Sequence, residues 1–151
     1  MKATAMRPIT SDETPATDPL VDLPGYLLRR AANAMMAELA TRLAVLDLRI
    51  SEATVLLLLG SRRDLTSAKI GKALDIERAN MAPLLARLEQ AGLIRREPIN
   101  RKSQAILLTQ DGVSRLGQVQ SVTRQFETDL LDRIPDAHRA HFVPALRALS
   151  G

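Results

Sequence analysis

The segment from residue 65 to residue 109 holds two short helical patterns followed by two strand-like runs, and this order restricts the fold more than any other feature of the chain. Thr66 is placed to cap the first helix. The apolar residues of that helix are expected on one side, at Ala68, Ile70, Ala73 and Leu74. A brief turn at Asp75 and Ile76 leads to a second helix, Glu77 to Ala91, which Gly92 should end.

The second helix has an apolar stripe that should face the core. Its members stand at the i, i+3, i+4 and i+7 positions, namely Met81, Leu84, Leu85 and Leu88. The stripe leaves Arg78, Asn80 and Arg87 on outward or flanking positions. Pro83 lacks the N–H that would bond the carbonyl of Ala79, so this helix should bend unless its first regular turn starts near Asn80.

The two strand-like runs, Leu93 to Ile99 and Ala105 to Thr109, are typical of a β-hairpin. They enclose a polar tip made of Asn100, Arg101, Lys102, Ser103 and Gln104. Helix, turn, helix and hairpin in this order predict a winged helix-turn-helix. We therefore expect a mainly α fold with a small β-hairpin wing.

Long amphipathic stripes flank this middle segment on both sides. The first starts at Pro24 and comprises Leu28, Ala32, Met35, Leu39, Leu43 and Leu46. The second follows a cap at Thr109 and an acid, Asp111, and comprises Leu116, Val119, Thr123, Phe126, Leu130 and Ile134. Its length, about 25 residues or nearly 38 Å, exceeds what a small domain needs to cover its own core. The extra length favours a dimer interface.

These patterns predict the domain organisation of the chain. Residues 1–22, rich in Pro and polar groups, are expected to be a disordered arm. Residues 23–151 form one domain, in which 24–48 and 110–149 are dimerisation helices and 51–109 the winged helix-turn-helix lobe. Within that lobe, Ser51 is expected to cap a short helix whose run from Val55 to Leu59 is apolar all round and therefore buried.

Positive charge is concentrated in the lobe. The whole chain has a formal net charge of +4. Residues 61–104 hold ten Lys and Arg against five Asp and Glu, a net of +5, so the rest of the chain is slightly acidic. The basic excess thus coincides with the segment whose shape suits a nucleic-acid groove.

Specific contacts can be proposed on this basis. Arg78 and Asn80 are candidates for pairing with guanine and adenine edges in a major groove. At the hairpin tip, Arg101 and Lys102 suit a minor groove or its phosphates. The remaining candidates would contact phosphate and set the register: Ser67, Lys69 and Arg87.

Composition argues against an enzyme. The absence of Cys excludes disulfides, thiolate zinc sites and thiol nucleophiles. The only two histidines, His138 and His141, are expected in the dimer seam and not as metal ligands. With no clustered acid, base or nucleophile, we expect no catalytic site, no metal and no cofactor. No apolar run could span a bilayer, and Met1 to Arg7 leads into polar residues, so a cytoplasmic location is expected.

From Gly25 to about Leu149 the chain resembles the MarR family of dimeric winged-helix repressors. The resemblance rests on four stretches and their spacing: Tyr26 to Arg30, Ile70 to Leu74, Arg87 to Arg96, and Leu108 to Gly112. It implies a homodimer joined through the terminal helices and an effector pocket between those helices and the lobe. The implied effector residues are Tyr26, Arg29, Arg30, Asn33 and Met36.

The chain departs from the family pattern in the wing and in the second helix. Asn100 and Lys102 stand where the family usually has Asp-x-Arg. In the family, the Asp commonly pairs with a nearby Arg, which corresponds to Arg96 here. Asn100 can accept a hydrogen bond, but as a neutral side chain it supplies no countercharge to Arg96. Lys102 keeps the charge without the planar fork of arginine. Pro83 replaces a residue that is often polar or basic, which favours base contacts upstream of it.

The sequence therefore predicts a regulator that binds a pseudo-palindromic DNA operator as a homodimer. It is expected to be a repressor released by a small aromatic or lipophilic effector, acidic if Arg29 or Arg30 holds a carboxylate. Two alternatives stay open. One is a constitutive or architectural DNA-binding protein without an effector, and the other is a helical protein-interaction module whose wing meets protein.

Overall fold

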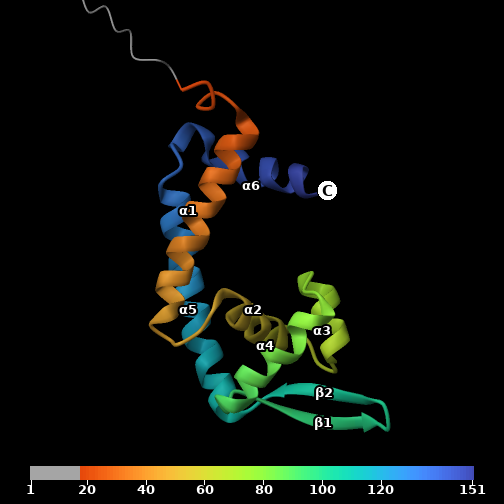
Figure 1. Cartoon of the computed structure of the whole chain (residues 1–151). Coiled ribbons are helices and arrows are strands. Elements are labelled where there is room, and N and C mark those ends of the chain that lie inside the picture. The colour runs from red at the N-terminus through yellow and green to blue at the C-terminus, as the bar shows by residue number, and fades with distance from the viewer. Residues whose placement is uncertain (1–17) are drawn as a thin grey trace, which may run out of the picture. The chain divides into compact units, whose positions relative to one another are not determined.

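The computed structural model describes residues 18–151, which form six helices and one two-stranded sheet (Figure 1). Their order is α1 (Pro24–Ala44), α2 (Ile50–Ser61), α3 (Ser67–Leu74), α4 (Arg78–Gln90), β1 (Ile94–Asn100), β2 (Ser103–Leu108), α5 (Gln110–Asp132) and α6 (Asp136–Ser150). The predicted mainly α fold with a hairpin wing is confirmed.

The described residues divide into two compact units, 18–35 and 36–151, with the boundary inside α1. Of the predicted arm, residues 1–17 lie outside the described part of the chain. The described end of the arm forms turns, in which the Asp18 carboxylate accepts the backbone N–H of Leu20 at 3.0 Å. Within the same unit, Leu28 is 44% exposed although it belongs to the predicted apolar stripe.

The predicted cap and turn of the helix-turn-helix are confirmed. The Thr66 hydroxyl accepts the backbone N–H of Lys69 at 3.3 Å. Asp75 adopts a left-handed φ of 53°, and the N–H of Ile76 bonds the Gly71 carbonyl at 2.9 Å, which ends α3.

The predicted apolar side of α3 is only partly right. Ile70 is buried and Leu74 is half-buried, but Ala68 and Ala73 are exposed. The helix meets its neighbours at Gly71, where an added Cβ would stand 3.1 Å from the Ile76 carbonyl and 3.3 Å from Met81. α3 therefore packs against its neighbours through Gly71, and the side chains of Ala68 and Ala73 lie on its exposed side.

α4 begins at Arg78, one residue after the predicted start, and runs without interruption past Pro83. Its buried side chains are Met81, Leu85 and Leu88, while Leu84 of the predicted stripe is half-buried. Gly92, at a φ of 71°, ends the helix as predicted, and the N–H of Leu93 then bonds the Leu88 carbonyl at 3.0 Å.

The hairpin is longer, and its tip shorter, than predicted. β1 and β2 pair antiparallel from Ile94 opposite Leu108 to Asn100 opposite Ser103. Asn100, Ser103 and Gln104 therefore belong to strands, and only Arg101 and Lys102 form the tip. The reason is local: the Asn100 side-chain oxygen accepts the Lys102 N–H at 2.9 Å and closes a two-residue turn.

α2 starts differently from the prediction. It begins at Ile50, and Ser51 is exposed inside its first turn, so Ser51 is not the cap. The cap position is held by Arg49, whose backbone N–H donates to the Glu52 carboxylate at 2.9 Å. The predicted burial of the run from Val55 to Leu59 is confirmed in part. Val55 and Leu56 have no exposed surface and Leu59 is buried, but Leu57 and Leu58 are half-buried.

α5 follows the predicted cap at Thr109, whose hydroxyl accepts the N–H of Gly112 at 3.0 Å. Gly112 is required by close approach, because an added Cβ would stand 1.9 Å from the Leu93 carbonyl. Of the predicted stripe, Leu116, Val119 and Phe126 are buried. Ile134 lies beyond the helix end.

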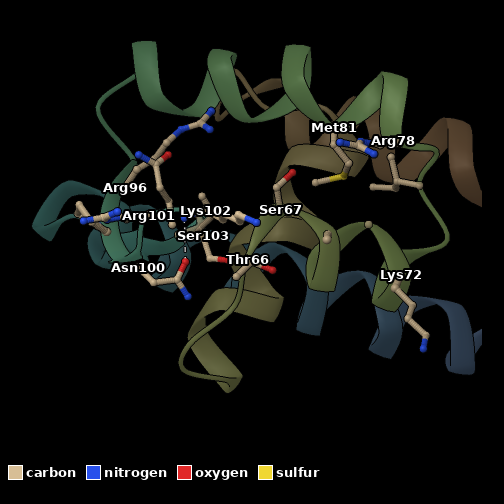
Figure 2. A pocket seen from close by; sticks show the side chains of 16 residues that line it. Thr66, Ser67, Lys72, Arg78, Met81, Arg96, Asn100, Arg101, Lys102 and Ser103 are labelled. Carbon is tan, nitrogen blue, oxygen red and sulfur yellow. Dashed lines mark hydrogen bonds between the residues drawn. The ribbon is translucent and has the colours of Figure 1, made fainter.

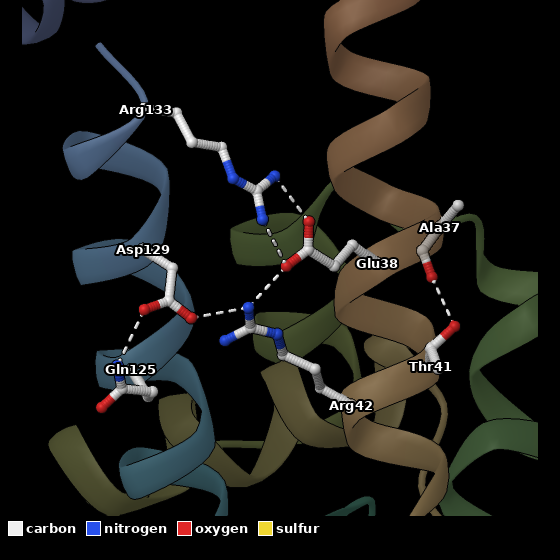
Figure 3. Close-up of polar contacts among 7 residues, drawn as sticks. All are labelled: Ala37, Glu38, Thr41, Arg42, Gln125, Asp129 and Arg133. Atoms are coloured by element: carbon white, nitrogen blue, oxygen red, sulfur yellow. Dashed lines mark hydrogen bonds and ion pairs between the residues drawn. The ribbon is translucent and has the colours of Figure 1, made fainter.

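A network of charged side chains joins the second half of α1 to α5 (Figure 3). Arg133 donates to both Glu38 oxygens at 2.7 and 2.9 Å, and Arg42 lies 2.5 Å from Glu38 and 2.6 Å from Asp129. Hydrogen bonds from Arg133 and then Arg42 lower the pKa of Glu38. Hydrogen bonds from Gln125 and then Arg42 lower the pKa of Asp129. We call these five residues the α1–α5 network.

α6 has no buried residue. Val143, Leu146 and Leu149 are exposed, and so are both histidines, His138 and His141. Among the described residues no helix is long and apolar enough to cross a membrane.

Candidate nucleic-acid interface

A surface groove of about 930 Å³ lies between α3, the start of α4 and the hairpin (Figure 2). We call it the hairpin groove. Its lining contains five cationic side chains and no Asp or Glu. The five are Lys72, Arg78, Arg96, Arg101 and Lys102. A concave surface lined by one sign of charge concentrates its field, so this groove attracts anions.

Four of these five cations have no carboxylate partner within residues 18–151: Lys72, Arg78, Arg101 and Lys102. All four are exposed. Arg96 differs, because its Nε lies 3.2 Å from the Glu89 carboxylate of α4. Outside the groove, Arg95 on the same strand pairs with Glu97. The hairpin thus neutralises the cations near its base and leaves those at its tip free.

The start of α3 adds backbone donors to the groove. Thr66 and Ser67 are both in the lining, and Ser67 is the first residue of the helix. The Thr66 hydroxyl already accepts from Lys69. The N–H groups of Ser67 and Ala68 have no acceptor within residues 18–151, as is usual in a first helical turn. Such donors favour a phosphate or carboxylate oxygen.

The groove brings together four of the seven residues predicted to contact DNA: Ser67, Arg78, Arg101 and Lys102. In Figure 2 they approach it from α3, α4 and the tip. Lys69 is not in the lining, and its ammonium group donates to the Asp64 carbonyl at 3.1 Å.

Asn80 and Arg87 line a separate surface cavity on another side of α4. The Nε of Arg87 lies 2.5 Å from Glu52, a carboxylate that is only 2% exposed. Sequence reasoning missed this partner, because Glu52 lies 35 residues away. Contact between Arg87 and phosphate remains a prediction.

Sequence reasoning also missed Lys72 and Arg96 as groove residues. Arg96 could have been found from strand alternation, since Arg96, Pro98 and Asn100 stand two residues apart and all line the groove. The expected link from Asn100 to Arg96 is not made. Asn100 accepts the Lys102 N–H, and Arg96 takes its countercharge from Glu89.

The predicted effector residues lie elsewhere. In the first unit, the guanidinium groups of Arg29 and Arg30 lie 5.3 and 5.8 Å from the centre of the Tyr26 ring, and Asn33 is exposed. In the second unit, Met36 is 51% exposed. An effector site at these residues remains a prediction. Within residues 18–151 no group of three or more His, Cys, Asp or Glu side chains could hold a metal.

Comparison with known proteins agrees with this geometry. Residues 48–103 match the model of the MarR family. The transcriptional regulator PecS of Dickeya dadantii is 34% identical over 94 residues, which cover 61% of this chain and 54% of that protein. The curated relatives are matched over only 52–60% of their length, and they are named as transcriptional regulators and not as enzymes.

Solved structures match over more of the chain. The transcriptional repressor CouR, bound to a 23-mer DNA duplex, has a TM-score of 0.78 and 26% identity, covering 85% of this chain and 93% of that one. A MarR-family protein of Mycobacterium tuberculosis in complex with salicylic acid has a TM-score of 0.67 and 26% identity, covering 83% and 95%. Over residues 48–103, which include the helix-turn-helix and most of the hairpin wing, the chain is thus similar to the MarR family of winged-helix proteins.

Proposed function

We propose that this protein is a transcriptional regulator that binds duplex DNA with the hairpin groove and the exposed face of α4. The observation that carries the proposal is the groove itself, where five cations and no carboxylate line a concave surface. A polyanion relieves the mutual repulsion of such cations and releases its own counterions on binding. The DNA-bound repressor CouR, at 26% identity, supports the choice of duplex DNA as that polyanion.

Each candidate residue then has a role that follows from its position. Arg78 and Asn80, exposed in the first turn of α4, would contact base edges in the major groove. Arg101 and Lys102 at the hairpin tip would contact the backbone or minor groove. Ser67 and the free N–H groups of α3 would bind phosphate and fix the register, and Lys69 would add charge nearby.

We propose that the regulator acts as a homodimer. Support comes from α6, which has no buried residue and exposes Val143, Leu146 and Leu149. A second copy would cover such a surface. Two α4 helices would then read half-sites about 34 to 36 Å apart, one turn of the DNA helix. We propose a cytoplasmic location, because the relatives with this role come from bacteria, whose DNA lies in the cytoplasm.

We further propose that it is a repressor released by a small aromatic or lipophilic acid. The support is the salicylic acid complex of the M. tuberculosis relative. The candidate residues are Tyr26, Arg29, Arg30, Asn33 and Met36. Arg29→Ala should leave DNA affinity nearly unchanged and weaken the response to an acidic effector. An unchanged response in titrations with aromatic acids would exclude Arg29 from the site.

A second candidate is a constitutive DNA-binding protein without an effector, because the five cations that line the hairpin groove would bind DNA without one. A library of aromatic acids and thioesters that leaves DNA affinity unchanged would decide for this candidate.

Selection of binding sites from a pool of random duplexes tests the proposed function. The purified protein should enrich a pseudo-palindrome whose half-sites are about 10 base pairs apart. Arg124→Ala, which removes an exposed α5 cation outside the groove, is the matched control and should enrich the same sequence. A pool that shows no retention at low salt would refute DNA binding. Enrichment of single half-sites would refute the dimer.

A further inference from the structure

Glu52 is the one buried charged side chain among the described residues, at 2% exposure. Its two oxygens serve different elements. One accepts the backbone N–H of Arg49 at the start of α2, at 2.9 Å. The other accepts the Nε of Arg87, near the end of α4, at 2.5 Å. A buried carboxylate therefore links the central helix of the core to the helix proposed to read DNA.

Among the described residues, α4 has one other side-chain ion pair, in which exposed Glu89 binds Arg96 of the hairpin and not the core. Its cap residue, Glu77, makes no side-chain hydrogen bond to the first turn. Pro83 cannot donate to the Ala79 carbonyl, so one bond of the helical ladder is missing. The buried residues Met81, Leu85 and Leu88 set which side of the helix faces the core. Apolar contacts are non-directional, so they tolerate a small rotation more readily than a hydrogen bond does.

The Glu52–Arg87 pair lies beside open space. Surface cavities of about 370 and 450 Å³ adjoin it, and both Glu52 and Arg87 line each of them. The two side chains are thus not confined by tight packing on those sides. The hydrogen bond between them therefore adds a directional constraint to the apolar packing of Leu85 and Leu88 at the end of α4.

We propose that Glu52 is a positioning residue that sets the rotation of α4 through Arg87. The inference rests on the proposed DNA-binding function and assigns Arg87 a role other than phosphate contact. Arg78 and Arg87 are nine residues apart, about 13 to 14 Å along the helix, so a pair near one end controls how the other end meets the bases. Loss of the pair then weakens sequence-specific binding more than binding to random duplex.

The test compares Glu52→Gln, Arg87→Lys and the double variant on the selected duplex and on a random duplex. Arg87→Lys keeps the positive charge but lacks the Nε donor. We expect it to lower affinity for the selected duplex about tenfold, with an unchanged slope of log affinity against log salt. Glu52→Gln keeps the size and an acceptor oxygen, so its loss should be smaller, about threefold. The double variant should be no weaker than Arg87→Lys.

The fold of each variant can be checked independently of DNA binding. Both substitutions nearly conserve side-chain volume, and thermal unfolding shows whether each variant is native at the assay temperature. Single variants that bind the selected duplex like wild type would overturn the inference. So would losses that multiply in the double variant, or equal losses on both duplexes. Wild-type protein that retains no duplex refutes the proposed function itself, a result distinct from these.

Discussion

The hairpin groove and the α1–α5 network both contain several arginine side chains, but they differ in how the charge is compensated. In the network, Arg42 and Arg133 each lie within 2.9 Å of a carboxylate oxygen. In the groove, four cations have no carboxylate partner within residues 18–151. Charge counts along the sequence cannot separate the two cases. The difference shows that an anion-binding surface is identified by cations without a carboxylate partner in the protein, more than by the number of cations.

The two regions also differ in what their charges do for stability. Exposed ion pairs contribute little to folding, because water and salt screen them. The network therefore aligns α1 with α5 more than it stabilises the fold. Unpaired like charges repel each other and slightly destabilise the free protein. A bound polyanion removes the repulsion among the cations of the groove, so its binding stabilises the groove. The charges of the network are already paired and receive no such stabilisation.

The largest expected effect comes from reversing the charge of the hairpin tip. Arg101→Glu combined with Lys102→Glu should lower affinity for any duplex about 100-fold or more, because two phosphate contacts become repulsive. Fluorescence anisotropy with a labelled duplex measures this. Arg62→Glu combined with Arg63→Glu makes the same change of charge at exposed sites between α2 and α3, outside the groove. If this control lost as much affinity, total charge and not the groove would explain binding.

Arg78→Ala should have a smaller and more selective effect. Loss of a bidentate base contact costs about 1–3 kcal/mol, so affinity for the selected duplex should fall about 5- to 150-fold. Affinity for random duplex should fall much less. Competition between the two duplexes gives the ratio directly. An equal loss on both would make Arg78 a phosphate contact.

Lys102→Ala should weaken binding to all sequences to a similar extent. Its signature is the salt dependence, whose slope should become shallower by about one. Titrations at four or more salt concentrations measure the slope. An unchanged slope would remove Lys102 from the backbone contacts and place the tip outside the interface.

The smallest effect is expected in the network, where Glu38→Gln should leave DNA affinity unchanged and alter only acid stability. The pKa of Glu38 is held below its ordinary value of 4.5 by Arg133 and Arg42. A carboxyl whose pKa is lowered by folding stabilises the protein above its unfolded value, and this contribution is lost as the pH falls through the lowered native pKa. Wild type should therefore lose more Tm than Glu38→Gln between pH 5 and acid conditions. Parallel Tm curves would show that the network is not formed in solution.

Much of the fold could be predicted because its signals are local. Thr66, Thr109 and Gly92 each act within a few residues of themselves, and the sequence was sufficient to place all three. Ser51 failed as a cap because Glu52 captures the Arg49 N–H one residue earlier. The hairpin tip was overestimated because Asn100 closes a two-residue turn.

The site was less predictable because it depends on contacts between distant residues. Arg87 was expected to be free, but its partner Glu52 comes from α2. Arg96 was expected to receive no countercharge from Asn100, and its actual partner, Glu89 on α4, was not anticipated. Lys72 enters the groove from the side of α3, which sequence periodicity did not single out. Pairing of charges across elements follows from packing, and packing is not readable from a single sequence.

The salt dependence of wild-type binding to a mixed-sequence duplex tests the central claim most directly. Each phosphate neutralised contributes a slope of about −0.9 in a plot of log affinity against log salt. Lys72, Arg101 and Lys102 are the unpaired cations of the hairpin groove that are not assigned to bases, so they predict binding at low salt with a slope of about −2 to −3 for each subunit. Failure to retain the duplex at low salt, or a slope near zero, would contradict the account.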